Sequence, residues 1–337
     1  MSLTRYGAGL EEIEGLLGSW GEKPYRARQL WDGLYRRRAP LEELTDLGKG
    51  LRERLAGALA LELVPCTTST ADDGETLKWL WSASAGSEVE TVLMRYRDRA
   101  TVCVSSQAGC AMGCTFCATG QAGFERHLSA GEIVEQVARA QHASPGRVSN
   151  VVFMGMGEPL ANYDATWAAV ERLHDHFGIS ARHLTVSTVG VVPGIRRLAA
   201  EVLPVTLAVS LHAPDDDLRD KLVPLNRRYP LDEVLAAAGE YLERSGRRLS
   251  FEYAMIDGVN DSPAQAGALA RRLAGLGAHV NLIPLNPTAG FGVPATPPER
   301  IARFAERLRA GGVNATVRRN RGTSIDAACG QLRARHR

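Results

Sequence analysis

The feature that most constrains the fold is a repeated alternation of strand-like and helix-like segments from Thr101 onward. Short runs rich in apolar and β-branched residues are each followed by a stretch with helical spacing of its apolar residues. Strand, helix and strand in regular succession predict a parallel sheet with right-handed crossovers. The predicted strands are 101–104, 150–153, 184–187, 205–211, 249–254, 280–283 and 315–318.

Helices are expected between these strands. Ser129 is followed three residues later by Glu132, a pattern that is typical of a capped helix start. The number of units is too small for a complete eight-unit barrel, so the chain is predicted to be an α/β protein with a partial (β/α)6 barrel or a doubly wound sheet. In either fold the functional side chains gather at the C-terminal ends of the strands. The further predicted helices are 163–177, 193–201, 231–244, 263–276 and 299–310.

The residues before Thr101 follow a different pattern. Pro24 suits the first position of a helix, and five leucines between residues 41 and 55 have helical spacing. A small helical accessory domain is therefore expected at the N-terminus, and the arginine run at residues 36–38 makes RNA binding its expected role. Strand-like runs at 76–81 and 89–95 predict a β-rich connector. The expected parts are residues 1–60, 61–100 and 101–337, the last of them catalytic.

Charge and hydropathy narrow the class of partner. The formal net charge is only +2, which excludes a polycation, but RNA binding needs only a local basic patch. No run approaches about 18 apolar residues and no secretory signal is present, so a cytoplasmic location without membrane contact is expected. The candidate basic patches are Arg36, Arg37 and Arg38, and the C-terminal set Arg318, Arg319, Arg321, Arg333, Arg335 and Arg337.

The strongest chemical motif is a triplet of cysteines at Cys110, Cys114 and Cys117, directly after the first strand of the repeat. In a cytoplasmic protein, clustered cysteines indicate metal ligands or catalytic thiols rather than disulfides. A structural zinc site takes four protein ligands. Three thiolates can instead hold an iron–sulfur cubane and leave one iron open for another ligand.

The spacing of this triplet, with Phe116 before the last cysteine, resembles the cluster loop of the radical S-adenosylmethionine (SAM) superfamily. The resemblance implies that Cys110, Cys114 and Cys117 hold a 4Fe-4S cluster whose free iron binds SAM. One electron, supplied by a donor such as flavodoxin or ferredoxin, then cleaves SAM to methionine and a 5′-deoxyadenosyl radical.

Several polar residues near strand ends are candidates for holding SAM. The next strand ends in Met154-Gly-Met-Gly157-Glu158-Pro159, which resembles the superfamily's loop for the methionine end of SAM. The other candidates could hold ribose or carboxylate groups, although each could equally be an ordinary turn residue. They are Ser187, Ser210, Leu211, His212 and Asn286.

Two further cysteines carry a more specific resemblance. The segments Val102-Cys103-Val-Ser-Ser-Gln-Ala-Gly-Cys110 and Arg321-Gly-Thr-Ser-Ile-Asp-Ala-Ala-Cys329-Gly-Gln331 closely resemble the RlmN/Cfr family of RNA adenine methyltransferases. The resemblance extends over about residues 24–332. One departure is Val189 in Ser-Thr-Val-Gly190, where some relatives have serine.

The resemblance implies roles for these residues. Cys329 takes a methyl group from one SAM, and the radical from a second SAM removes a hydrogen from that methyl. The thiomethylene then adds to the adenine, and Cys103 releases the adduct by forming a disulfide with Cys329. A reductant later opens this disulfide. Glu90 matches the family's proposed proton acceptor, and Cys103 is the competing candidate.

The implied product is 2-methyladenosine at the peptidyl-transferase centre of 23S rRNA, with tRNA as a second substrate in some relatives. The RlmN-like N-terminal run and the Arg321-Gly-Thr-Ser-Ile-Asp tail favour carbon 2 over the carbon 8 that Cfr methylates in antibiotic resistance. Two alternatives stay open at this point. One is a radical SAM enzyme that uses the thiols differently, and the other is an RNA-binding protein with structural zinc.

Overall fold

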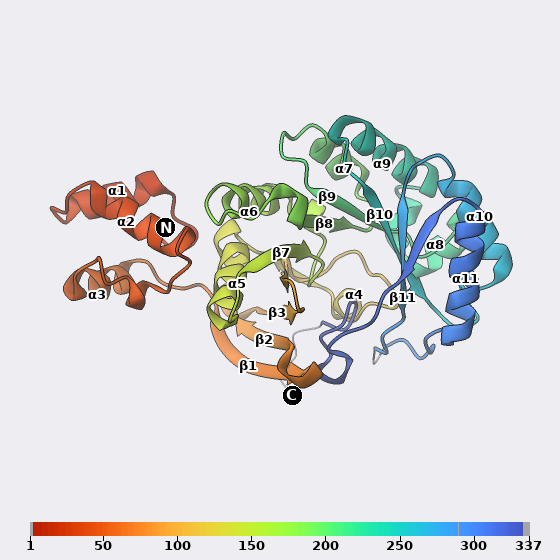
Figure 1. Cartoon of the computed structure of the whole chain (residues 1–337), viewed down its shortest axis with the longest axis horizontal. Helices are drawn as coiled ribbons and strands as arrows, with labels where there is room; N and C mark the ends of the chain where they lie inside the picture. Colours follow the sequence, from red (N-terminus) through yellow and green to blue (C-terminus); the bar gives the residue numbers. More distant parts are fainter. Residues whose placement is uncertain (1–2, 289, 333–337) are drawn as a thin grey trace.

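A single ten-stranded sheet dominates the computed structural model, which describes residues 3–288 and 290–332 (Figure 1). Seven of its strands are parallel and pair in the order in which they occur in the sequence. A doubly wound sheet would reverse its direction of growth, so this order confirms the partial barrel. The strands are β4 (Ala100–Cys103), β7 (Val148–Phe153), β8 (Leu184–Thr188), β9 (Thr206–Ser210), β10 (Leu249–Met255), β11 (His279–Pro284) and β12 (Asn314–Val317).

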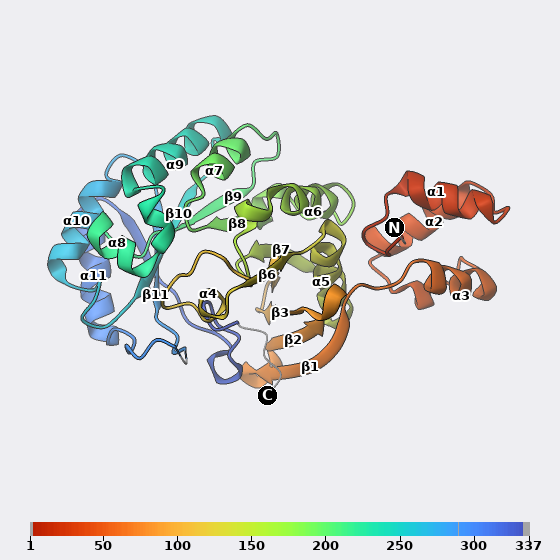
Figure 2. The same ribbon diagram turned by 180° about the vertical axis from the view of Figure 1, so that it is seen from behind.

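The crossover helices lie outside the curved sheet, as both ribbon views show (Figures 1 and 2). Ser129 Oγ accepts from the Glu132 amide at 3.0 Å and the Glu132 carboxylate accepts from the Ser129 amide at 2.8 Å, so the predicted helix cap is confirmed. The helices are α5 (Ala130–Ala143), α6 (Tyr163–Asp175), α7 (Val192–Ala199), α9 (Leu231–Ser245), α10 (Pro263–Leu273) and α11 (Pro298–Ala310).

Four short elements in the barrel domain lie outside the sequence prediction. Each spans fewer than eight residues, too few for a periodic pattern to stand out. Two of them flank the cysteine triplet and one follows β9. They are β5 (Gln107–Gly109), α4 (Ala118–Ala122), β6 (Phe124–His127) and α8 (Asp216–Leu222).

Three antiparallel strands extend the sheet beyond β4. The predicted β2 (Thr76–Ser82) and β3 (Glu88–Arg95) are confirmed, and β1 (Val64–Ala71) is an addition. Most of β1 is exposed because it is the edge strand, so its Thr- and Ser-rich sequence gave no apolar signal. These strands place Glu90 on β3, the strand next to the β4 strand that carries Cys103, and Lys78 on β2, one strand farther out.

Three helices lie to one side of the barrel (Figure 1). They are α1 (Leu10–Ser19), α2 (Tyr25–Tyr35) and α3 (Lys49–Ala58). The leucine run was expected to be continuously helical, and this is wrong. A short 3-10 turn at Leu41–Glu43 and a non-helical stretch precede α3. Leu44 and Leu47 are fully buried in that stretch, and burial alone explains their apolar character.

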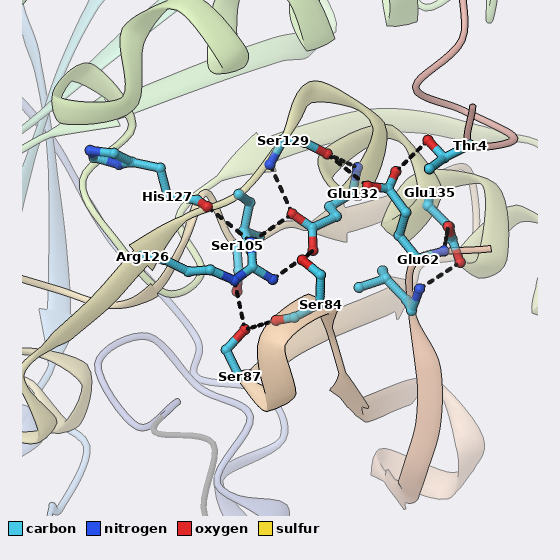
Figure 3. A network of polar contacts seen from close by, with 12 residues as sticks. Thr4, Glu62, Ser84, Ser87, Ser105, Arg126, His127, Ser129, Glu132 and Glu135 are labelled. Atoms are coloured by element: carbon cyan, nitrogen blue, oxygen red, sulfur yellow. Dashed lines mark hydrogen bonds and ion pairs between the residues drawn. The ribbon is translucent and has the colours of Figure 1, made fainter. Parts of the chain in front are cut away.

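A polar network joins the N-terminal segment to the barrel (Figure 3). Glu135 on α5 accepts from the backbone amides of Glu62 and Leu63 at 2.8 and 3.2 Å. The Glu62 carboxylate accepts from Thr4 Oγ1 at 2.9 Å and from Ser129 Oγ at 3.2 Å. Burial raises the pKa of Glu135 to about 7. These contacts fix the chain where it passes from the accessory helices into β1.

Across residues 3–288 and 290–332, the helices are all too short or too polar to cross a bilayer.

Candidate functional site

The inner face of the barrel strands surrounds a cavity of about 480 Å³. Successive side chains of a strand point to opposite faces, so alternate residues face inward. Strands covered on both faces are usually almost entirely apolar. Here many inward positions carry polar groups, which marks this face as a binding surface. These polar lining residues include Thr101, Asn150, Thr185, Ser187, Thr206, Ser210, Ser250, Glu252 and Asn281.

The cysteine triplet lies in the loop between β5 and α4. Cys114 and Cys117 line the cavity, and Cys110 is buried beside them. Burial raises the pKa of Cys110 to about 12 and that of Cys114 well above its usual range, and the neighbouring thiols add to both shifts. The three thiols therefore form one group.

The donor set of this loop fits a cubane cluster better than a single ion. In the part of the chain that the structure describes, no three His, Cys, Asp or Glu side chains converge as ligands of one metal ion. A cubane needs one thiolate for each of three irons, so its ligands stand farther apart. Cys110, Cys114 and Cys117 supply these three thiols, two of them at the wall of the cavity.

The loop after β7 places backbone groups against the cavity. Gly155 and Gly157 both line it. Gly157 has φ +102°, and a Cβ there would lie 2.6 Å from the Cβ of Gln107, so only glycine fits. Its neighbour Glu158 lines the cavity but is almost fully buried. The Glu158 carboxylate accepts from the amides of Leu160 at 3.0 Å and Val189 at 2.8 Å and so ties the loops after β7 and β8 together.

Ser187, Ser210 and His212 line the same cavity. Ala254 N–H donates to His212 Nδ1 at 3.0 Å, which assigns the ring proton to Nε2. Burial, together with the Arg219 charge, lowers the pKa of His212 to about 3, so the ring is neutral. Phe116 of the cluster loop packs edge-on against this ring, with centroids 4.7 Å apart.

Leu211 differs from its neighbours, because its side chain is buried in the core and does not line the cavity. Its carbonyl accepts from Nε of Arg219 at 3.0 Å. Arg219 is fully buried and also donates to the carbonyls of Val189 and Ser210 at 2.6 and 3.1 Å. This arginine, which has no sequence signal of its own, fixes the ends of β8 and β9.

The two outlying thiols line the same cavity. Cys103, on β4, and Cys329 both line it, and Cys103 packs in one apolar cluster with Ala327. The Cys329 residue is exposed to solvent, because the cavity that it faces is open, although other parts of the protein lie around it. Burial raises the pKa of Cys103, and the nearby Cys329 raises it further. Burial also raises the pKa of Cys329.

Asn286 positions the segment that carries Cys329. Its side-chain Nδ2 donates to the Cys329 carbonyl at 3.0 Å, and its Oδ1 accepts from Asn320 at 2.6 Å. Asn286 also lines the cavity, as the strand-end pattern predicts.

Glu90 lies on β3, just outside the cavity lining. It is 5% exposed, and its carboxylate pairs with Lys78 Nζ at 2.8 Å. Its backbone carbonyl accepts from Ser105 Oγ at 2.6 Å. Glu90, Val92 and Met94 alternate along β3 and share a face, and Met94 lines the cavity. Glu90 thus points toward the cavity side of the strand.

Sequence reasoning missed a polar group on β10 and β11. The Glu252 carboxylate accepts from Ser250 Oγ and from Asn281 Nδ2, each at 2.8 Å, and all three residues line the cavity. Polar residues at alternate positions of a predicted buried strand were the available signal.

The basic patches divide into two kinds. Arg36 and Arg37 are exposed and pair with acidic neighbours. Arg38 instead donates through Nε and Nη2 to the Phe177 carbonyl at 3.1 and 2.7 Å, so it joins α2 to the barrel. Arg318, Arg319 and Arg321 line the cavity. The remaining predicted arginines, Arg333, Arg335 and Arg337, lie outside the described residues.

Comparison with known proteins agrees with this geometry. Residues 104–267 match the radical SAM superfamily, and residues 6–61 match the ribosomal RNA large subunit methyltransferase N-terminal domain. A probable dual-specificity RNA methyltransferase RlmN of Parafrankia sp. is 55% identical over 96% of this chain and 90% of its own length. The corresponding Thermobifida fusca protein is 53% identical over 96% of this chain and 93% of its own length.

A solved structure extends the likeness to three dimensions. The crystal structure of a radical SAM methyltransferase from Sphaerobacter thermophilus superimposes with a TM-score of 0.94 at 52% identity. The superposition covers 99% of this chain and 100% of that one. Sequence and fold agree over nearly the whole chain. The chain therefore belongs to the RlmN family of radical SAM RNA methyltransferases.

Proposed function

We propose that this enzyme methylates carbon 2 of an adenosine at the peptidyl-transferase centre of 23S rRNA and an adenosine beside the anticodon of tRNA. The relatives are named dual-specificity RNA methyltransferases, which supports two RNA substrates. The observation that carries the proposal is that Cys103 and Cys329 line one cavity together with Cys114 and Cys117. Two free thiols beside a cluster loop suit a covalent methyl carrier and its resolving partner.

The chemistry of adenine explains why a thiol carrier is needed. Carbon 2 is electron-poor and cannot attack the methyl of SAM directly. Cys110, Cys114 and Cys117 would hold the cluster, and Gly157, Glu158, Ser187, Ser210, His212 and Asn286 would hold SAM, with Leu211 contributing only through the strand end that it helps to form. Bound there, the 4Fe-4S cluster and SAM supply one-electron cleavage to a 5′-deoxyadenosyl radical.

Cys329 carries the methyl group in this proposal. Its sulfur displaces S-adenosylhomocysteine from a first SAM and becomes a thioether. A second SAM would supply the radical, so two would be used per turnover. The methyl carbon, having lost one hydrogen atom, bonds to carbon 2 and links protein to RNA. Covalent catalysis of this kind divides one difficult substitution into easier steps.

Cys103 and Glu90 complete the transfer. Glu90 accepts the carbon-2 proton from the adduct. The Cys103 thiolate attacks the Cys329 sulfur, so the sulfur–sulfur bond forms as the sulfur–carbon bond breaks. The bonding pair passes to the methylene carbon, which takes a proton and becomes the new methyl group. A dithiol reductant then restores both thiols.

The remaining partners follow from this chemistry. An acidic one-electron carrier such as flavodoxin or ferredoxin supplies the electron for SAM cleavage. The RNA substrates place the reaction in the cytoplasm, where a thiol reductant is also available. The exposed Arg36 and Arg37, just after the end of α2, would contact phosphates together with the cavity-side Arg318 and Arg319. These contacts would orient a splayed-out base.

The test is an oxygen-free assay of the iron-reconstituted protein with methyl-deuterated SAM and RNA that lacks the modification. Digested nucleosides are identified by mass spectrometry, with Cys329→Ala as the control. The expected product is 2-methyladenosine with two deuterons in its methyl group, absent from the control. Labelled 8-methyladenosine would replace the carbon-2 proposal with the Cfr reaction. If a preparation that cleaves SAM yields only unlabelled adenosine, neither RNA is a substrate and the proposal is wrong.

A further inference from the structure

Lys78 makes two contacts that no sequence pattern indicates. Its ammonium group lies 2.8 Å from Glu90 Oε1, and it donates to the backbone carbonyl of Asp326 at 3.2 Å. Asp326 stands three residues before Cys329 in the same loop. One cation therefore contacts both the proposed proton acceptor and the segment that bears the methyl-carrying thiol.

The ion pair is shielded from solvent. The Lys78 and Glu90 side chains are 13% and 7% exposed. Ion pairs at the surface contribute little to stability, whereas a shielded pair holds both side chains in a defined geometry. Removing one partner leaves the other charge buried without compensation, which has a large free-energy cost. A lysine in this position fixes the direction of the Glu90 carboxylate.

The Asp326 contact is part of a wider attachment of the Cys329 segment to the antiparallel strands. The amide of Gly322 donates to Asp72 Oδ2 at 3.0 Å, and Arg321 pairs with Glu75 at 2.9 Å. Asp326 itself has φ +51°, a conformation that non-glycine residues rarely adopt and that surrounding contacts must hold. Lys78 thus joins a strained turn of the segment to β3.

We propose that Lys78 is a positioning residue that sets the Glu90 carboxylate relative to the Cys329 segment during adduct breakdown. This inference rests on the proposed function. In that step the carbon–hydrogen bond at carbon 2 breaks, its electron pair stays with the ring, and Glu90 takes the proton. The unpaired electron left by radical addition must also leave the ring, and a bound cluster, oxidised when SAM is cleaved, would be its acceptor. Lys78 exchanges no proton and acts only through Glu90 and Asp326.

The experiment follows the two half-reactions separately under single-turnover conditions. Intact-protein mass spectrometry measures methylation of Cys329, and denaturing gels measure the lifetime of the covalent protein–RNA adduct. Lys78→Met should methylate Cys329 at the normal rate but break down its adduct about 10- to 100-fold more slowly, because small misplacements of a reacting group have effects of that size. Lys78→Arg should recover most of the rate, since its guanidinium can reach both partners.

The controls make the inference falsifiable. Arg196→Met removes a cation from an exposed ion pair with Glu240 in the same domain and should change neither half-reaction. In a double-mutant cycle, Lys78→Met should slow adduct breakdown less in the Glu90→Gln background than in the wild type, because only its contact with Asp326 then remains to be lost. Three outcomes would overturn the role of Lys78. The first is a double variant whose slowing equals the product of the two single effects, and the second is normal adduct breakdown in Lys78→Met. The third is an equal loss of Cys329 methylation in Lys78→Met and Lys78→Arg. Normal breakdown in Glu90→Gln would instead refute the proposed role of Glu90.

Discussion

The side-chain amide of Asn286 donates a hydrogen bond to the main-chain carbonyl of Cys329 at 3.0 Å. This bond connects the end of β11 to the segment that carries the thiol, which has no regular secondary structure around Cys329. The thiol therefore takes its position from side-chain contacts to the barrel rather than from a helix or strand.

Asn286→Ala should loosen this segment. A lost hydrogen bond of about 1 kcal/mol predicts a roughly five- to tenfold slower methylation of Cys329 by SAM, measured by intact-protein mass spectrometry. Asn314→Ala, at the exposed start of β12, should leave the rate unchanged. Equal rates for the two variants would show that Asn286 does not position the thiol.

Arg38 should stabilise the docking of the N-terminal helices. Its two hydrogen bonds to the Phe177 carbonyl predict that Arg38→Asn lowers the free energy of unfolding by about 1 to 3 kcal/mol in urea titrations. Asparagine is the suitable replacement because residue 38 has φ +56° and asparagine tolerates that conformation. Arg36→Asn, on a 77% exposed side chain, should have no measurable effect on stability.

In RNA binding, Arg36→Asn should have the larger effect and Arg38→Asn the smaller one. Arg36→Asn should reduce the dependence of RNA affinity on salt, because a phosphate contact releases counterions. A larger loss of salt dependence in Arg38→Asn than in Arg36→Asn, without any loss of stability, would contradict the docking role.

Glu135 should make stability depend on pH. Its pKa is raised by burial from the ordinary 4.5 to about 7, so the folded state holds more protons than the unfolded chain between these values. The free energy of unfolding should therefore decrease as the pH rises from about 4.5 to 7, by about 2 to 3 kcal/mol from this group. Arg139 and Glu62 are the charged groups that face it.

Glu135→Gln should remove this contribution. Because burial also raises the pKa of Glu158 to about 7, the useful quantity is the difference between wild type and variant at each pH. The advantage of the wild type should shrink between pH 5 and 7.5 in urea titrations. A pH-independent difference would mean that Glu135 is charged in the folded protein.

The barrel could be predicted because its elements repeat. Each of its seven predicted parallel strands is confirmed, with bounds that agree within two residues at both ends. The N-terminal leucines were misread because Leu44 and Leu47 are buried outside any helix. Regular spacing of apolar residues indicates which residues are buried. It indicates a helix only where the residues between them also have helical backbone angles.

The site was predictable where a motif or a strand end carries the chemistry. The structure brings Cys103, Cys329 and the cluster loop to one cavity, although they are far apart in sequence. Lys78 and Arg219 could not be found in this way. Their importance lies in contacts between segments, such as Lys78 with Asp326 and Arg219 with Val189, and no local pattern encodes those.

The most direct test of the central claim uses Cys103→Ala, which keeps the carrier thiol and removes its resolving partner. The variant is incubated without oxygen with methyl-deuterated SAM, a reductant and substrate RNA, and the digested product is sequenced by mass spectrometry. We expect a stable adduct in which a CD2 bridge joins the Cys329 sulfur to carbon 2 of adenosine. Normal release of methylated RNA, or attachment through another residue, would contradict it.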